Sequence, residues 1–338
     1  MSMKKFILPL FISITLLTGC SSLVSSSQDF FSMDTFMNIT VWANSQAKAD
    51  SILIDSEKKV NELSSSLSRQ VSQSIISKLN SANGEPVTLD DVTYDVIKKA
   101  VELAKFTNGA FDPTTSALTD LWGIGTDNPH VPTQSEINEA LTHVGYQNIV
   151  IMDNNQVMLK NGVQIDLGGI GKGYATDYIS EGIQTPMLAR LGGNIGAYGD
   201  NPKSNDGLWT IGLADPDNSS NYIATLKIKN LSVVTSGDYE RYFEKDGVRY
   251  HHIFDTRTGA PAQNELRAVT VINESSTRAD AFTTALFVMG LDKGIEFCKQ
   301  NNISAIFITK DHILYPVGNL TDTLALAQGT NYEISTNV

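Results

Sequence analysis

The alternation of apolar and polar residues along the chain predicts several helices of ordinary length. Apolar residues recur at helical spacing over residues 45–67. A second helix is expected to start at Asp90, a good N-cap residue, and to run through Val96 and Ala104 to an end just before Gly109. The other predicted helices span residues 172–183, 278–289 and 292–301.

Short apolar runs bounded by turn residues predict strands, most of them in the second half of the chain. Because strands and helices do not alternate strictly as βαβ units, the pattern favours an α+β fold over a doubly wound sheet. After residue 31 there is no long linker or repeat, so we expect a single large mixed domain, with room for two lobes. The predicted strands are 36–42, 164–167, 188–191, 209–214, 223–228, 231–235, 267–272, 304–309 and 313–317.

The N-terminal residues have the order of a secretory signal. Lys4 and Lys5 precede an uncharged apolar stretch over residues 6–17, and the small residues that follow end at Cys20. Twelve residues are too few for a spanning helix, which needs about 20. A cysteine at this place matches the lipobox of bacterial lipoproteins, and a multiply acylated Cys20, carrying palmitate for example, would anchor stably. An ordinary cleaved signal with an incidental cysteine is the alternative.

These observations predict three segments: a signal peptide over residues 1–19, a Ser-rich tether over 20–31 and the folded domain over 32–338. We expect a lipoprotein anchored outside the cytoplasm, on the periplasmic face of a Gram-negative envelope or the outer surface of a Gram-positive one.

Charge and cysteine content exclude some classes of function. Loss of Lys4 and Lys5 with the signal changes the formal charge of the 338-residue chain from −12 to −14. No cluster of Lys and Arg stands out, so nucleic acid is not an expected partner. Cys298 is the only cysteine besides Cys20, which leaves no internal disulfide or cysteine metal cluster, and we expect it in the core.

A glycine-rich segment, DLGGIGKGYA over residues 166–175, is the densest chemical signal. It places Asp166 at the end of a predicted strand and Lys172 at the start of a helix, where backbone amides favour anionic groups. Neither the Walker loop nor the dinucleotide-binding spacing fits it. On the glycines alone, a purely structural turn explains the segment equally well.

Residues 277–287 form a second candidate, on a predicted helix. Asp280 and Thr284 are four apart and so share a helical face. A carboxylate and a hydroxyl with a nearby backbone carbonyl make an all-oxygen site, which suits Mg²⁺ or Mn²⁺ together with substrate phosphates. In isolation, a helix cap and an exposed hydroxyl would explain the same residues.

The third candidate is the pair His251 and His252, within residues 250–259. A histidine near a carboxylate is a natural general base for a hydroxyl nucleophile. A zinc site lacks the partners that usually accompany it. Taken alone, one structural and one exposed histidine is the simpler interpretation.

Together these segments resemble the ApbE family of flavin transferases, over nearly the whole chain from about Met33 to Gly290 and beyond. Members of that family hold FAD with a divalent metal at its pyrophosphate. They move the FMN half onto a threonine or serine hydroxyl of an acceptor protein, and AMP leaves. The segments that carry the resemblance are Ser32–Met37, Asn108–Thr114, Leu121–Gly125, Asp166–Ala175, Leu191–Asn194, Thr235–Arg241, Tyr250–Gly259 and Thr277–Phe287.

The resemblance implies a flavin site between strand ends and helix N-termini, and a role for each matching residue. Metal ligands would be Asp280, Thr284 and the backbone carbonyl of Gly169. His252, rather than His251, would take the proton of the acceptor hydroxyl. The residues that would contact FAD are Met33, Ala110, Phe111, Asp112, Asp166, Lys172 and Ile253.

The sequence departs from the family pattern in three places. Asp34 stands where the family usually has glycine, Asp255-Thr256 replaces its common Asp-Pro, and the Ser-rich stretch Leu63–Ser77 matches poorly. Two other activities stay open: a metal-dependent FAD pyrophosphatase that yields FMN and AMP, and a flavin-binding lipoprotein without turnover. Neither the acceptor protein nor the oligomeric state is indicated.

Overall fold

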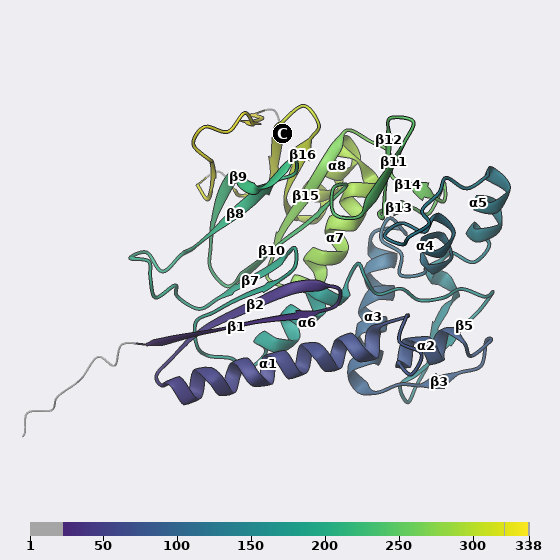
Figure 1. Cartoon of the computed structure of the whole chain (residues 1–338), viewed down its shortest axis with the longest axis horizontal. Helices are drawn as coiled ribbons and strands as arrows, with labels where there is room; N and C mark the ends of the chain where they lie inside the picture. The colour runs from purple at the N-terminus through teal and green to yellow at the C-terminus, as the bar shows by residue number, and fades with distance from the viewer. Residues whose placement is uncertain (1–22, 321, 337–338) are drawn as a thin grey trace, which may run out of the picture.

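The computed structural model describes residues 23–320 and 322–336. In this part of the chain, nine strands form one large sheet, in which every neighbouring pair is antiparallel except the last (Figure 1). The mostly antiparallel arrangement confirms the α+β prediction. In sheet order the strands are β1 (Val24–Ser32), β2 (Thr35–Ala43), β6 (Met187–Leu191), β7 (Asn194–Tyr198), β10 (Leu231–Gly237), β15 (Leu266–Asn273), β16 (Ser304–Thr309), β17 (Ile313–Val317) and β19 (Glu333–Ile334).

The main hydrophobic core lies between this sheet and a layer of helices. Alternate residues of β2, namely Met37, Ile39 and Val41, are buried there because side chains of a strand alternate between its two faces. The helices of this layer include α1 (Gln46–Leu67), α3 (Asp91–Phe106), α6 (Gly171–Ser180), α7 (Ser276–Met289) and α8 (Leu291–Asn301).

A second core covers part of the opposite face of the sheet. Trp42 of β2 meets Trp209 there, with ring centroids 5.2 Å apart. A third, smaller core surrounds Trp122, whose indole N–H donates to the carbonyl of Gly259 at 2.9 Å. The second core is closed by β8 (Trp209–Asp215), β9 (Asn218–Ile228) and β18 (Leu324–Leu326); the third involves α4 (Ser116–Trp122), α5 (Gln134–Leu141), β11 (Tyr242–Lys245), β12 (Val248–His251), β13 (Phe254–Asp255) and β14 (Ala260–Pro261).

The remaining elements pack against the main core next to α1 and α3. They are α2 (Ile75–Asn80), the 3₁₀ turn Tyr146–Asn148 and a three-stranded sheet of β3 (Val87–Thr88), β5 (Gln156–Leu159) and β4 (Ile149–Ile151).

Most predicted elements are confirmed. Asp90 caps α3 by accepting from the backbone N–H of Thr93 at 2.9 Å. Gly109 follows the end of that helix with a φ of +79°. Cys298 is buried on α8, as expected. The helix predicted over residues 172–183 ends earlier, at Ser180.

The tether predicted over residues 20–31 is wrong from Val24 onward, because β1 begins there. Every residue of β1 pairs with β2, and Ser27 donates a side-chain hydrogen bond to the carbonyl of Ile39 at 3.3 Å. Strand pairing uses backbone groups. A Ser-rich segment with few apolar residues can therefore form the edge strand of a sheet.

The strand predicted over residues 164–167 is also wrong. Ile165 belongs to no strand, and its N–H and carbonyl are both bonded to the side-chain amide of Asn80, at 2.7 and 2.9 Å. The N–H of Asp166 donates to the carbonyl of Pro113 at 2.8 Å. A side chain and a loop therefore satisfy the backbone that a neighbouring strand would otherwise satisfy.

The signal segment and Cys20 lie outside the described residues. Within residues 23–320 and 322–336, no helix has the length and apolar character needed to span a bilayer.

Candidate active site

The glycine-rich segment enters α6, and its first turn meets helix α7 at a hydrogen bond from a backbone N–H to a carboxylate. The N–H of Gly173 donates to Oδ2 of Asp280 at 2.8 Å. A Cβ atom at position 173 would lie 2.7 Å from the Cβ of Asp280 and would collide with the carbonyl oxygen of Ser276. Only glycine lets α6 and α7 approach this closely, and the contact joins the two segments that the sequence singled out separately.

The residues of the three predicted metal ligands lie on α7 and on the loop beside it. Asp280 is inside α7 and buried, with Thr284 one turn further along. A Cβ on Gly169 would lie 3.5 Å from Oγ1 of Thr284 and 3.3 Å from the ring of Phe111, so the loop runs directly past the helix. Asp280 is not the helix cap, since Ser275 has that role, and the alternative interpretation of Asp280 as a cap is wrong.

The chemistry of these donors suits a hard cation. They are one carboxylate, one hydroxyl and one backbone carbonyl, all oxygen ligands, the type that Mg²⁺ binds together with water and substrate phosphates. In the described residues, no group of three or more His, Cys, Asp or Glu side chains could hold a metal ion.

His252 is arranged to accept a proton. Its Nδ1 lies 3.3 Å from the carbonyl oxygen of Arg241, which can only accept, so Nδ1 carries the hydrogen and Nε2 has the free lone pair. Burial lowers the pKa of His252 to about 3, with further lowering from the charge of Arg241, from His251 and from Lys172. The imidazole is therefore neutral at pH 7.

His251 has a different environment. Its Nε2 bonds the carbonyl of Ala262 at 2.8 Å, and its Nδ1 accepts from the N–H of Ile253 at 3.3 Å. The ring is buried and packs edge-on against Phe287. Because both ring nitrogens form hydrogen bonds within the protein, His251 holds the backbone around Ile253 and Ala262 in place. Burial lowers the pKa of His251 as well.

Comparison with known proteins decides the family. The model of the ApbE family matches residues 33–307. The chain belongs to the ApbE family.

Relatives and solved structures of similar overall length agree with this. An FAD:protein FMN transferase of Treponema pallidum (strain Nichols) is 36% identical over 265 residues, which cover 72% of this chain and 73% of the relative. One of Klebsiella pneumoniae (strain 342) is 37% identical over 248 residues, covering 71% and 76%. The crystal structure of the ApbE protein of Thermotoga maritima has 37% identity and a TM-score of 0.78, covering 85% of this chain and 95% of that one. The flavin transferase ApbE of Vibrio cholerae has 28% identity and a TM-score of 0.76, covering 90% and 97%.

In this ApbE-family chain, Lys172 lies near the first turn of α6 with its Nζ 3.5 Å from the carbonyl of Gly168. Its charge acts on His252, as does that of Arg241. Two positive charges therefore act on the neutral imidazole, and such charges attract anionic groups such as phosphates.

Asp166 is held by Arg69, a residue that no sequence pattern marks. Its Oδ1 accepts from the N–H of Gly168 at 2.9 Å, and its Oδ2 pairs with Nε of Arg69 at 3.0 Å. Arg69 also forms a two-point ion pair with Asp120 of α4, at 2.7 and 3.1 Å. Arg69 lies in the stretch that matches the family poorly, so neither motif nor resemblance could have identified it.

The hairpin turn between β1 and β2 brings Met33 to the same end of the sheet. Met33 and Asp34 both have positive φ, 48° and 57°, as a two-residue hairpin turn of type I′ requires. Asp tolerates this conformation, so Asp34 in place of glycine leaves the hairpin intact. Thr35 next to the turn lies beside Gly192, and the side chain of Lys172 lies on that glycine too.

The remaining predicted contacts are wholly or partly buried. Ala110 is half-buried, whereas Phe111 and Ile253 are buried. The carboxylate of Asp112 accepts from Thr114 N–H at 2.8 Å and from Tyr146 N–H at 3.0 Å, while burial raises its pKa. Asp112 thus uses its side chain to hold the loop in place.

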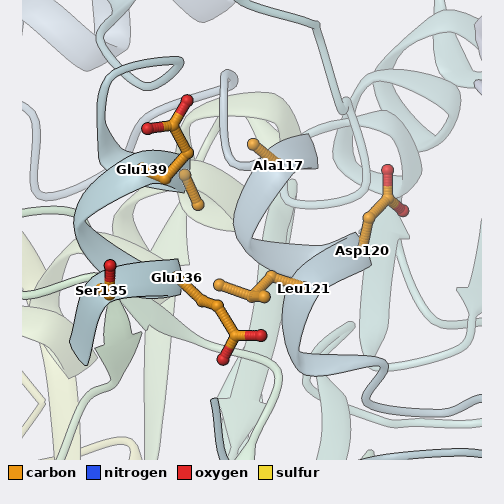
Figure 2. A pocket seen from close by; sticks show the side chains of 7 residues that line it. Ala117, Asp120, Leu121, Ser135, Glu136 and Glu139 are labelled. Atoms are coloured by element: carbon orange, nitrogen blue, oxygen red, sulfur yellow. The ribbon is translucent and has the colours of Figure 1, made fainter. Parts of the chain in front are cut away.

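An open pocket of about 640 Å³ between α4 and α5 is a different place from the Gly173–Asp280 contact. Figure 2 shows that its polar side chains include the carboxylates of Asp120, Glu136 and Glu139. With no basic residue in its lining, it is unsuited to the phosphates of FAD.

Proposed function

We propose that this chain transfers the FMN moiety of FAD to a serine or threonine hydroxyl of an acceptor protein and releases AMP. Its relatives from Treponema pallidum and Klebsiella pneumoniae carry the name FAD:protein FMN transferase. The observation that carries the proposal is the Gly173–Asp280 contact, which joins an anion-favouring loop to an all-oxygen donor set.

The proposal assigns Mg²⁺, with Mn²⁺ as a substitute, to Asp280, Thr284 and the carbonyl of Gly169. When bound, the ion would neutralise negative charge on the pyrophosphate oxygens of FAD. The oxygen-only donor set supports this choice over zinc. Lys172 would add a second positive charge on the same phosphates.

His252 would act as the general base. The acceptor hydroxyl gives its proton to Nε2 while its oxygen bonds to the phosphorus of the FMN half, and the bond from that phosphorus to the AMP oxygen breaks. The free imidazole, with a pKa of about 3, is a weak base. Bound phosphates would raise this pKa, because a nearby negative charge favours the imidazolium form. Proton transfer would thus be favoured once FAD is present.

The rest of the proposed FAD contacts lie around the same end of the sheet. They involve Met33 in the hairpin turn, the Ala110–Asp112 segment, Asp166 and Ile253. Since the side chains of Asp112 and Asp166 are engaged by other residues, we propose that they shape the FAD site by fixing the loops that line it.

We also propose that the enzyme works outside the cytoplasm, anchored through a lipidated Cys20. The apolar stretch and the small residues before Cys20 support this. The acceptor would then be an envelope protein that carries a serine or threonine at its flavinylation site.

The experiment that tests the function mixes the protein with Mg²⁺, FAD and a purified envelope flavoprotein in its flavin-free form, followed by intact-mass analysis. Addition of one FMN to the acceptor supports transfer. Free FMN and AMP with an unmodified acceptor identify a pyrophosphatase instead. Unchanged FAD identifies a flavin-binding protein without turnover.

A further inference from the structure

Helices α6 and α7 are joined a second time, one helical turn beyond Gly173. Asp177 on α6 accepts from the N–H of Ser276 at 2.8 Å and from the N–H of Thr277 at 2.9 Å. It also accepts from the hydroxyls of Ser275 and Thr277, at 2.8 and 2.6 Å. One half-buried carboxylate therefore receives four hydrogen bonds from three consecutive residues at the start of α7.

The partners of Asp177 are groups that a helix cannot satisfy by itself. The first N–H groups of a helix have no internal acceptor and carry partial positive charge. Ser275 already caps α7 from within the same chain segment, by accepting from the N–H of Arg278 at 3.3 Å. Asp177 adds charge-assisted bonds from a different helix, so it fixes how far α7 is displaced along α6.

That displacement determines the geometry of the proposed metal ligands. Asp280 follows Ser276 by one turn of α7, and Thr284 follows by another, whereas Gly169 belongs to the loop that leads into α6. Mg²⁺ requires ligand distances of about 2.0–2.1 Å in near-octahedral geometry. One helical turn rises about 5.4 Å, so a shift of a small fraction of a turn would separate the ligands.

We propose that Asp177 is a positioning residue for the metal site, which keeps Asp280 and Thr284 in register with the Gly169 carbonyl. The proposal rests on the metal assignment made for the transferase function. Asp177 itself touches neither metal nor substrate; it acts through the first turn of α7. The competing explanation is an ordinary helix cap that stabilises the fold and leaves metal affinity unchanged.

Asp90 provides a matched control for that explanation. It caps α3 in the same way, accepting from the N–H and the hydroxyl of Thr93 at 2.9 and 2.8 Å. Asp90→Asn and Asp177→Asn each remove one charge from a helix start, but only Asp177 is linked to the helix with the metal ligands. If both residues only stabilise the fold, their replacement lowers the melting temperature in both variants and leaves metal affinity unchanged.

The test is the dissociation constant of Mn²⁺ in the presence of FAD, measured by electron paramagnetic resonance, with melting temperatures on the same samples. Loss of a residue that orients metal ligands typically weakens metal affinity about 10–100-fold. We expect a loss of that size for Asp177→Asn and none for Asp90→Asn. In transfer assays, Asp177→Asn should raise the KM for Mg²⁺ while kcat at saturating Mg²⁺ stays close to that of the wild type.

A milder variant keeps the test decisive if Asp177→Asn does not fold. Thr277→Val removes one hydroxyl donor without a change of charge, and it should weaken Mn²⁺ binding several-fold. Wild-type Mn²⁺ affinity in folded Asp177→Asn, or in Thr277→Val when Asp177→Asn does not fold, would overturn the proposal. Absence of Mn²⁺ binding by the wild type would overturn it together with the metal assignment. FMN addition to an acceptor, measured separately, judges the transferase function independently of both.

Discussion

The N–H of Gly173 and the carboxylate of Asp280 are 107 positions apart in sequence and joined by a hydrogen bond of 2.8 Å. This bond closes the contact between α6 and α7, and it engages one oxygen of the carboxylate that we assign to the metal. The close approach leaves no space for a side chain at position 173.

Gly173→Ala should therefore be damaging although alanine favours helices. Its methyl group would collide with Ser276 and Asp280, and overpacking of this kind costs about 1–3 kcal/mol. Gly171→Ala is the matched control. A Cβ atom at position 171 would lie 4.0 Å from a methyl group of Leu67, which is an ordinary contact. Gly173→Ala should lower both the stability measured by urea denaturation and the affinity for FAD. Gly171→Ala should change both quantities little. Equal stability of the two variants would contradict the close contact.

The metal assignment predicts that Asp280→Ala abolishes turnover and makes added Mg²⁺ irrelevant. Asp280→Asn is the safer variant for folding, because its amide oxygen can still accept from Gly173, whose N–H would otherwise be buried without a partner. Both should lose metal-dependent FAD binding, measured by fluorescence quenching with and without Mg²⁺. Full wild-type activity in excess EDTA would rule the metal site out.

The two neighbouring histidines should respond differently to replacement. His252→Ala should lower the rate of FMN transfer by about 10²–10⁴-fold, the usual contribution of a general base, and change FAD affinity little. His251→Ala should instead lower the melting temperature, because its ring is buried and both nitrogens are bonded within the protein. Transfer rate, FAD affinity and melting temperature are measured on the same preparations. A folded His252→Ala protein with near-normal transfer would remove the assignment, and His251 would become the next candidate.

The lowered pKa of His252 predicts a dependence of stability on pH. The pKa is 6.5 for an unperturbed histidine and about 3 in the folded protein, so between these values the unfolded chain binds a proton that the folded chain does not. Stability should therefore fall as the pH is lowered through this window. His252→Gln removes the titrating group, so between pH 6.5 and 4 its melting temperature should fall less than that of the wild type. Parallel curves would show that the histidine is not held neutral.

Much of the fold was predictable because its patterns are local. The apolar spacing over residues 45–67 and the cap at Asp90 correspond to α1 and the start of α3. The strand β1 was missed because its Ser-rich sequence gives little apolar alternation, and its stability comes from pairing with β2. The apolar run before Asp166 was mistaken for a strand, because the hydrogen bonds of Ile165 come from the distant Asn80 and not from a neighbouring strand.

The candidate site was predictable only where its residues belong to motifs. The spacing of Asp280 and Thr284 and the glycine loop were visible in the sequence, and the structure brings them together. Arg69 and Asp177 were missed, because the partner of a single charged residue cannot be identified from a local sequence pattern. The different environments of His251 and His252 likewise depend on Ala262 and Arg241, which no local pattern connects to them.

The anchoring proposal predicts that Cys20→Ala moves the protein from the membrane fraction to the soluble fraction. A lipid chain contributes about 0.8 kcal/mol of membrane binding per buried methylene group, so its loss should be decisive. An uncleaved signal could still retain the variant, and mass spectrometry of the wild-type N-terminus resolves that case. A mature wild-type protein without lipid on Cys20 would exclude the anchor.

The most direct test of the central claim is the intact mass of a flavin-free acceptor protein after incubation with FAD and Mg²⁺. We predict a gain of one FMN on a serine or threonine, with one AMP released for each acceptor modified. The gain should be absent with Asp280→Asn and strongly slowed with His252→Ala. An unmodified acceptor, alongside stoichiometric free FMN and AMP, would contradict transfer and show that water is the true acceptor.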